Sequence, residues 1–192
     1  PLRGLRVLDG TAGLGQDALH LAGWGAEVVA VERVPALGCL LEGFLRRAAA
    51  DPEAAWGPAA QRIEVLLGAV EPSLAALGRD AVDVVFLDPM FEAPRAAAPG
   101  YDLFRRWASD AQLTQASLTE AIRAARERVV WKVPKGTAPP LEDLRAFNRR
   151  VTSKAFDYWI VEKALPAPEW APLHRRRRPD PYPKPPAELS AP

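Results

Sequence analysis

Short apolar runs alternate along the chain with longer segments in which apolar residues recur at helical spacing. The short runs are rich in β-branched and aliphatic residues and predict buried strands at residues 5–9, 27–32, 63–67, 82–87 and 129–133. The longer segments predict helices at residues 16–24, 36–50, 113–126 and 141–150, with a short helix between the third and fourth strands. Two closing strands, at residues 151–155 and 158–162, are too close in the chain for a helical crossover, so we expect them to pair antiparallel.

This alternation predicts a parallel sheet with right-handed crossovers and helices on both faces. With the closing hairpin added, the expected fold is α/β and Rossmann-like, with a mostly parallel seven-stranded sheet that ends in an antiparallel hairpin. A flavodoxin-like sheet would not need that hairpin. We expect one domain over residues 1–164. Residues 165–192 are dense in proline and contain an arginine run at 175–178, which predicts an extended or disordered tail.

The composition narrows the class of protein. The chain has 192 residues, is 48% hydrophobic and carries a net charge of +1, so a sizeable core is possible and a polyanionic partner is not demanded. Cys39 is the single cysteine, and His20 and His174 are the two histidines. No intramolecular disulfide and no zinc-ligand spacing can be assembled from them, which fits a cytoplasmic protein without a metal. No apolar run approaches the roughly 18 residues that span a bilayer, and no membrane partner is expected.

The first strand runs into a glycine-rich turn that directly follows Asp9. Its glycines, Gly10, Gly13 and Gly15, fall as G-x-x-G-x-G rather than as the G-x-G-x-x-G of dinucleotide enzymes. Glycines here let the backbone at Gly13 and Gly15 approach a ligand at the carboxyl edge of the sheet. Asp9 would repel a phosphate but can receive the cationic, amino-acid end of S-adenosylmethionine, directly or through water. The spacing therefore disfavours a nicotinamide oxidoreductase.

Three further positions complete the predicted cofactor site. Asp17, in the first turn of the next helix, either caps that helix or contacts the ligand. Glu32 ends the second strand about 20 residues after the glycine turn, where an acid accepts hydrogen bonds from ribose hydroxyls. Ala69 and Val70 follow the third strand, where adenine would lie, and offer mainly backbone contacts.

The fourth strand ends in Asp88-Pro89-Met90-Phe91, which resembles the Asp/Asn-Pro-Pro-Tyr/Phe signature of amino-group methyltransferases. An exocyclic amine is a poor nucleophile because its lone pair is delocalised into the ring. The Asp88 carboxylate and the Pro89 carbonyl could accept its two hydrogens and align the lone pair with a methyl group, while Phe91 offers a stacking face. Positioning and electrostatics would then supply the catalysis, without a strong base. Asp-Pro also commonly begins a turn, so the motif indicates catalysis mainly because it directly follows the fourth strand.

Together these motifs resemble the RsmJ family, guanine-N2 methyltransferases of small-subunit (16S) ribosomal RNA with the class I methyltransferase fold. The matching runs are D-G-T-A-G-L-G-Q-D-A at 9–18, V-E-R at 31–33, L-D-P-M-F at 87–91 and V-W-K-V-P at 130–134. The resemblance covers about residues 5–163. It implies S-adenosylmethionine contacts at Gln16, Asp17, Glu32, Arg33, Ala69, Val70 and Asp88. Ala69 and Val70 replace a more polar pair. The chain opens at Pro1, and the family's N-terminal region is expected to be absent or shortened.

The resemblance implies ribosomal RNA or the small ribosomal subunit as partner. Arginines 95, 105 and 106 and lysines 132 and 135 would lie on the substrate edge, either as phosphate contacts or as a solvated surface. The arginine run at 175–178 either adds non-specific RNA affinity or has no role. The alternatives left open are another amino-group methyltransferase, acting on DNA adenine or protein glutamine, and an inactive binding module with the same fold. The oligomeric state stays undetermined.

Overall fold

The computed structural model describes residues 2–89 and 113–163. Seven strands form one sheet in the order β3-β2-β1-β4-β5-β7-β6. The strands are β1 (Arg6–Asp9), β2 (Glu27–Glu32), β3 (Ile63–Leu67), β4 (Val82–Leu87), β5 (Ala125–Pro134), β6 (Arg149–Thr152) and β7 (Phe156–Glu162). The helices are α1 (Gln16–Gly23), α2 (Pro35–Ala50), α3 (Gly57–Ala60), α4 (Val70–Ala76) and α6 (Gln115–Ala124).

The pairing confirms the expected topology. β1 pairs parallel with β2 and with β4, β2 with β3, and β4 with β5. β7 pairs antiparallel with both β5 and β6. The carboxyl ends of five parallel strands therefore meet at one edge of the sheet, and the start of β7 joins them because Phe156 pairs with Pro134 at the end of β5.

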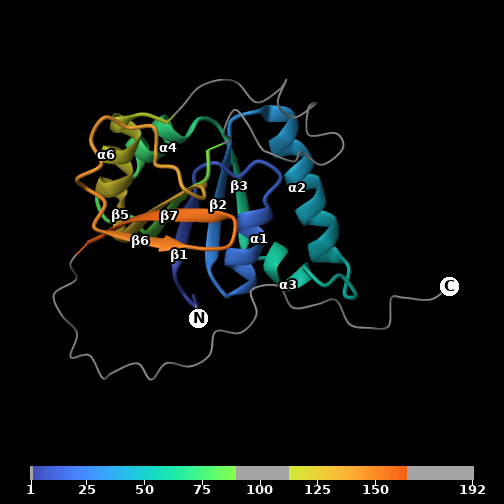
Figure 1. Cartoon of the computed structure of the whole chain (residues 1–192). Coiled ribbons are helices and arrows are strands. Elements are labelled where there is room, and N and C mark those ends of the chain that lie inside the picture. The colour runs from blue at the N-terminus through green and yellow to red at the C-terminus, as the bar shows by residue number, and fades with distance from the viewer. Residues whose placement is uncertain (1, 90–112, 164–192) are drawn as a thin grey trace.

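Helices cover both faces of this sheet (Figure 1). One apolar cluster joins α4 and α6 to the sheet and is centred on Trp131, Leu74 and Leu118, which are fully buried. The other joins α1, α2 and α3 to the opposite face, through residues such as Leu41 and Ala18. β4 is buried along its whole length, as expected of a central parallel strand covered on both sides. Among the described residues, no helix is long and apolar enough to cross a membrane.

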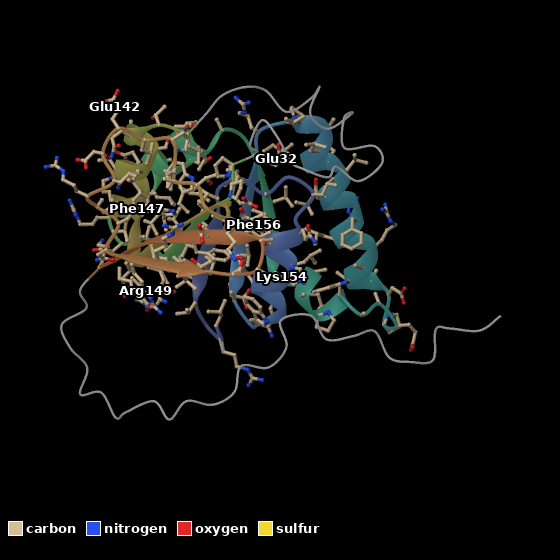
Figure 2. The ribbon with its side chains drawn as sticks, viewed as in Figure 1. Glu32, Glu142, Phe147, Arg149, Lys154 and Phe156 are labelled. Atoms are coloured by element: carbon tan, nitrogen blue, oxygen red, sulfur yellow. The ribbon has the colours of Figure 1, made fainter. Side chains whose placement is uncertain are left out.

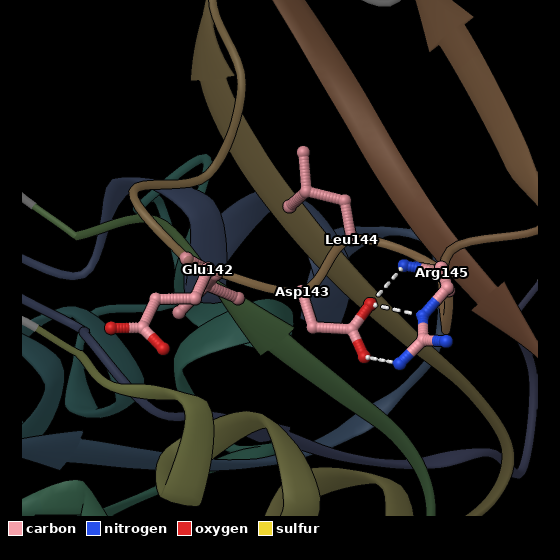
Figure 3. Close-up of a pocket in the computed structure, with 5 residues that line it drawn as sticks. Glu142, Asp143, Leu144 and Arg145 are labelled. Atoms are coloured by element: carbon pink, nitrogen blue, oxygen red, sulfur yellow. Dashed lines mark hydrogen bonds and ion pairs between the residues drawn. The ribbon is translucent and has the colours of Figure 1, made fainter.

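The helix expected at residues 141–150 is wrong. The segment has no helix, and its last two residues already belong to β6. The Asp143 carboxylate accepts hydrogen bonds from the backbone N–H of Arg145 and from its guanidinium (Figure 3), a local bond that competes with helix formation. Leu141 and Phe147 still pack against the core, so their spacing reflects burial from an irregular segment.

Several element boundaries also differ from expectation. β5 begins at Ala125 rather than near residue 129, and α6 ends correspondingly earlier. The charged residues 126–128 interrupt the apolar pattern, so the sequence does not show that the strand has already begun. Their side chains form ion pairs, among them Arg126 with Asp83, while their backbone pairs with β4. The closing strands begin at 149 and 156 rather than 151 and 158, and the four-residue α3 was not expected.

Gly10 should tolerate no side chain, because β1 turns there against two buried neighbours. A Cβ at Gly10 would lie 2.6 Å from Val70 Cγ2 and 2.7 Å from Leu87 Cδ2. Overpacking of this kind costs about 1–3 kcal/mol, so we expect Gly10→Ala to lower the free energy of unfolding by that amount in denaturant titrations. Gly78→Ala is the matched control, since a Cβ at that residue would meet no described atom within 4 Å. Equal losses in both variants would contradict the packing argument.

Candidate active site

The glycine turn after β1 is tied to the strands on both sides. The Gly10 N–H donates to the Phe86 carbonyl on β4, and the Ala12 N–H donates to the Val31 carbonyl on β2, each at 2.9 Å. Gly13 and Gly15 have φ of +55° and +77°, a left-handed conformation that favours glycine. No atom of the described residues lies within 4 Å of a Cβ placed on Gly13, so these residues leave open space on that side of the turn.

Thr11 adds a contact that the sequence did not predict. Its hydroxyl oxygen accepts a hydrogen bond from the Asp88 backbone N–H at 2.7 Å. The end of β4 is therefore fastened to the turn through a side chain as well as through Gly10. A threonine in a turn gives little signal in a sequence, because its partner lies 77 positions away.

Glu32 closes the other side of the turn. It is buried at the end of β2, and its two carboxylate oxygens accept hydrogen bonds from the Gly13 and Val34 N–H groups, both at 2.7 Å. Figure 2 shows Glu32 near the start of α2. Each oxygen of a carboxylate can accept a second hydrogen bond, so Glu32 keeps acceptor capacity toward a ligand. Arg33 beside it is half-buried.

Asp9 is a buried carboxyl at the end of β1. One oxygen, Oδ1, accepts a hydrogen bond from the Thr11 N–H at 3.2 Å, whereas the buried Oδ2 has no hydrogen-bond partner among the described residues. Burial raises the pKa of Asp9 from 3.8 to about 7; the Thr11 bond opposes that shift, and the charges of Asp17 and Asp88 add to it. The group is thus an acceptor with unused capacity that titrates near neutral pH.

Lys132 joins two of these acids. Its Nζ lies 2.7 Å from Asp17 Oδ2 and 2.8 Å from Asp88 Oδ2, and its side chain is 10% exposed. The Phe156 ring lies 4.5 Å from the same nitrogen, a cation–π contact. Asp17 comes from α1, Asp88 from the end of β4 and Lys132 from β5, so one ammonium gathers three elements at the sheet edge.

The charges in this cluster shift one another's pKa. Burial raises the pKa of Asp88 to about 6, against the opposing charge of Lys132 and together with that of Asp17. Burial works to lower the pKa of Lys132, but the charges of Asp88 and Asp17 outweigh it and raise that pKa above its ordinary value. The site therefore holds an acid near its titration point beside a firmly charged lysine.

This arrangement corrects the sequence-based interpretation of Lys132 and shows what the Asp17 side chain contacts. Lys132 is neither a phosphate contact nor a solvated charge, because it is buried in an ion pair with the two acids. The available signal was a lysine inside the apolar run V-V-W-K-V, since buried lysine is rare unless paired. The Asp17 carboxylate, expected either to cap α1 or to contact a ligand, is bound to Lys132. Lys135 is exposed.

The remaining predicted residues divide into three groups. Gln16 is exposed at the start of α1, and Pro89 is half-buried after Asp88. Ala69 is half-buried before α4, while Val70 is buried and packs toward Gly10. Phe91, the arginines at 95, 105 and 106, and the tail at 165–192 lie outside the described residues.

The acids that surround Lys132 outnumber the positive charge that faces them. Within residues 2–89 and 113–163, no group of three or more His, Cys, Asp or Glu side chains is placed to hold a metal ion. Asp9, Asp17 and Asp88 face a single ammonium, so negative charge is in excess whenever Asp9 is ionised. The surface hollow lined by residues 141–145 (Figure 3) includes none of these acids.

Comparisons with known proteins place this geometry in context. Residues 3–161 match a family described as "Putative SAM-dependent methyltransferase". The chain is 42% identical over 140 residues to "Ribosomal RNA small subunit methyltransferase J" of Pseudomonas aeruginosa, which covers 71% of this chain and 52% of that protein. A protein of the same name from Shewanella denitrificans is 43% identical over 159 residues, covering 80% of this chain and 62% of that protein.

A solved structure agrees with the fold. The crystal structure of a SAM-dependent methyltransferase from Neisseria gonorrhoeae is 31% identical, with a TM-score of 0.63, over 82% of this chain and 61% of that chain. The class I methyltransferase fold is thereby confirmed. The chain spans about half the length of the first curated relatives it matches.

Burial of Asp9 should destabilise the ligand-free protein in a pH-dependent way. The folded state keeps the Asp9 proton up to about pH 7, whereas the unfolded chain releases it near its ordinary value. The unfolded state is therefore favoured progressively as pH rises between these limits. We expect Asp9→Asn to raise the free energy of unfolding by about 1–3 kcal/mol at pH 7.5 and by less at pH 5.

Denaturant titrations at the two pH values measure this difference. Asp143→Asn is the control with the opposite sign, because side-chain and backbone hydrogen bonds from Arg145 lower the pKa of that exposed carboxyl to about 2. It should reduce stability rather than increase it. A gain for Asp9→Asn that does not change with pH would contradict the assignment of burial as the cause.

Proposed function

The chain belongs to the family of SAM-dependent methyltransferases, and from this premise we propose that it transfers a methyl group from S-adenosylmethionine to the N2 amino group of a guanosine in small-subunit ribosomal RNA. The observation that carries the proposal is Asp88, which stands at the end of β4 against the glycine turn and next to Pro89. The names of the curated relatives support ribosomal RNA as the substrate class. The proposed setting is the cytoplasm, with free ribosomal RNA or the small subunit as partner.

The cofactor would lie across the carboxyl ends of β1 and β2. In this proposal the Glu32 carboxylate accepts hydrogen bonds from the ribose hydroxyls, with Arg33 beside it. Ala69 and Val70 border the adenine. The unpartnered Asp9 Oδ2 and the excess of acids around Lys132 support a ligand that brings positive charge.

The amino-acid end would reach the start of α1. Asp9 and Asp17 receive its ammonium group there, directly or through water, and Gln16 lies next to them in the first turn. Beside Gly13, a ligand could approach the backbone without meeting a side chain of residues 2–89 or 113–163, and Gly15 keeps the turn in its left-handed conformation.

The transfer step follows from the placement of acceptors. When bound, S-adenosylmethionine supplies a methyl group on a positively charged sulfur. Asp88 accepts one hydrogen of the target amine and the Pro89 carbonyl accepts the other, which turns the nitrogen lone pair toward the methyl group. The nitrogen becomes cationic as its bond to carbon forms, and the Asp88 charge stabilises it. Its proton leaves afterwards to Asp88 or water, so no stronger base is needed.

The ribose assignment predicts a loss of affinity in Glu32→Ala. Removing the carboxylate leaves two hydroxyls without a charged acceptor and should weaken cofactor binding by about 1–3 kcal/mol in calorimetry. Glu32 also holds the Gly13 and Val34 N–H groups, so the melting temperature should fall as well. A lower melting temperature with unchanged affinity would assign Glu32 a purely structural role, and tighter binding of NAD than of S-adenosylmethionine would contradict the cofactor.

The catalytic assignment predicts a graded loss of turnover at Asp88. Asp88→Asn keeps an acceptor oxygen but loses the charge, and Asp88→Ala loses both, so the rate should fall further in the second variant. The loss of such an electrostatic contact typically costs about 10²–10³ in rate. Single-turnover assays with labelled cofactor and ribosomal RNA or small subunits measure it, and nucleoside analysis should find N2-methylguanine.

Two results would contradict this proposal at different levels. Label in N6-methyladenine or in protein would exclude guanine while leaving methyl transfer intact. Full activity of Asp88→Ala would exclude the proposed role of the carboxylate. Asp83→Asn is the control on the same strand, since Asp83 pairs with Arg126 and the Arg6 N–H rather than with the cluster; its turnover should be retained.

A further inference from the structure

Lys132 occupies a position that the proposed chemistry does not by itself require. Its ammonium contacts Asp88 at 2.8 Å and Asp17 at 2.7 Å, two carboxylates that would otherwise repel each other. Asp88 stands where methyl transfer is proposed to occur, and Asp17 stands where the amino-acid end of the cofactor is proposed to lie. The lysine is thus the counter-charge on which their proximity depends.

The lysine is held from several sides. β5 pairs with β4 on one side and β7 on the other, and Lys132 lies opposite Tyr158 in the second pairing. The Phe156 ring contacts the ammonium at 4.5 Å; Figure 2 labels this ring where β7 begins. A lysine side chain loses much rotamer freedom when it is fixed, and here two ion pairs and an aromatic ring offset that loss. Its burial excludes a direct role in gathering RNA phosphates.

We propose that Lys132 is a positioning residue of the methyl-transfer site, which holds the Asp88 carboxylate ionised and in a fixed orientation beside Asp17. The inference rests on the proposed function and adds the residue that prepares Asp88 for it. With Oδ2 bound to Lys132, the carboxylate cannot rotate freely, so its direction toward the target amine is set before the substrate arrives. Lys132 itself does not touch the reacting atoms.

Among the described residues, the charged groups that interact with Asp88 are Asp9 from β1, Asp17 from α1 and Lys132 from β5. From β7, the uncharged Phe156 ring contacts the Lys132 ammonium. Burial already raises the pKa of Asp88 to about 6. Without Lys132, burial and the charge of Asp17 would remain unopposed, and the pKa of Asp88 would move toward neutrality. A protonated Asp88 presents a donor where the target amine needs an acceptor.

The test compares Lys132→Met, Lys132→Arg and Lys163→Met in the full chain without ligand. Carbon-detected NMR of carboxyl-labelled aspartate follows the titration of Asp88, which the missing signal of Asp88→Asn assigns. We expect the Asp88 midpoint to rise by about one pH unit or more in Lys132→Met and to return most of the way in Lys132→Arg. Lys163→Met is the matched control, because Lys163 bonds Asp80 and two backbone carbonyls away from the cluster; its midpoint should equal that of the unmodified protein.

Single-turnover rates measured against pH provide the second readout. In Lys132→Met, the pH midpoint of methyl transfer should rise by the same amount as the NMR midpoint, with the KM for RNA unchanged. An unmoved Asp88 midpoint in a folded Lys132→Met protein would overturn the inference, as would a rise that Lys132→Arg does not reverse. If Lys132→Met fails to fold, Lys132→Gln takes its place in the same titration. Should the unmodified protein transfer no methyl group at any pH, the proposed function fails, and the NMR titration still decides the role of Lys132.

Discussion

β1 has a parallel partner on each side, β2 and β4, and this double pairing is the constraint on which the candidate site depends. The turn that follows β1 has to pass between two strand ends, so its backbone bonds to Phe86 on one side and Val31 on the other. Gly10 has no room for a side chain there. The same passage brings Asp9, Glu32 and Asp88 to one edge, although they are distant in the chain. The position of the acids is therefore a property of strand order rather than of any local motif.

The strand order also decides which of these acids need compensation. Glu32 accepts hydrogen bonds from two backbone N–H groups, those of Gly13 in the turn after β1 and of Val34 just after β2, and needs no cationic side chain for this. Asp17 and Asp88 lie close together at the sheet edge, and in the described part of the chain β5, the next strand in the order, supplies the cation between them. Lys132 can do so because side chains alternate along a strand: Trp131 and Val133 point into the α4–α6 core cluster, while Lys132 lies on the other side.

This division explains how far the sequence predicts the molecule. β2 and β4 have the expected limits because apolar runs in a covered parallel sheet reflect burial directly. β3 also has the expected limits, although this edge strand is half-buried or exposed along its length. The glycine turn and the acids after β1, β2 and β4 were identified because strand ends are visible in the chain. The contacts of Lys132 and Thr11 could not be predicted from the sequence, since strand order and side-chain direction determine the partner of each. The helix expected at 141–150 is absent because a local contact determines the backbone there. Leu141 and Phe147 have helical spacing, but the hydrogen bond from the Arg145 N–H to the Asp143 carboxylate closes a turn instead.

Asp9 connects stability with the proposed binding. A buried carboxyl oxygen without a partner destabilises the folded state once it is ionised, and Asp9 Oδ2 is such an atom. A ligand that brings positive charge next to Asp9 removes this destabilisation of the folded state. Part of the binding free energy of such a ligand therefore comes from compensating the buried carboxylate. Because the Asp9 pKa lies at about 7, a cationic ligand should bind with release of a proton in neutral buffer, and binding should strengthen as pH rises toward that value. The buried position of Asp9 at the end of β1 thus has two consequences. It destabilises the ligand-free fold, and it favours a cationic ligand.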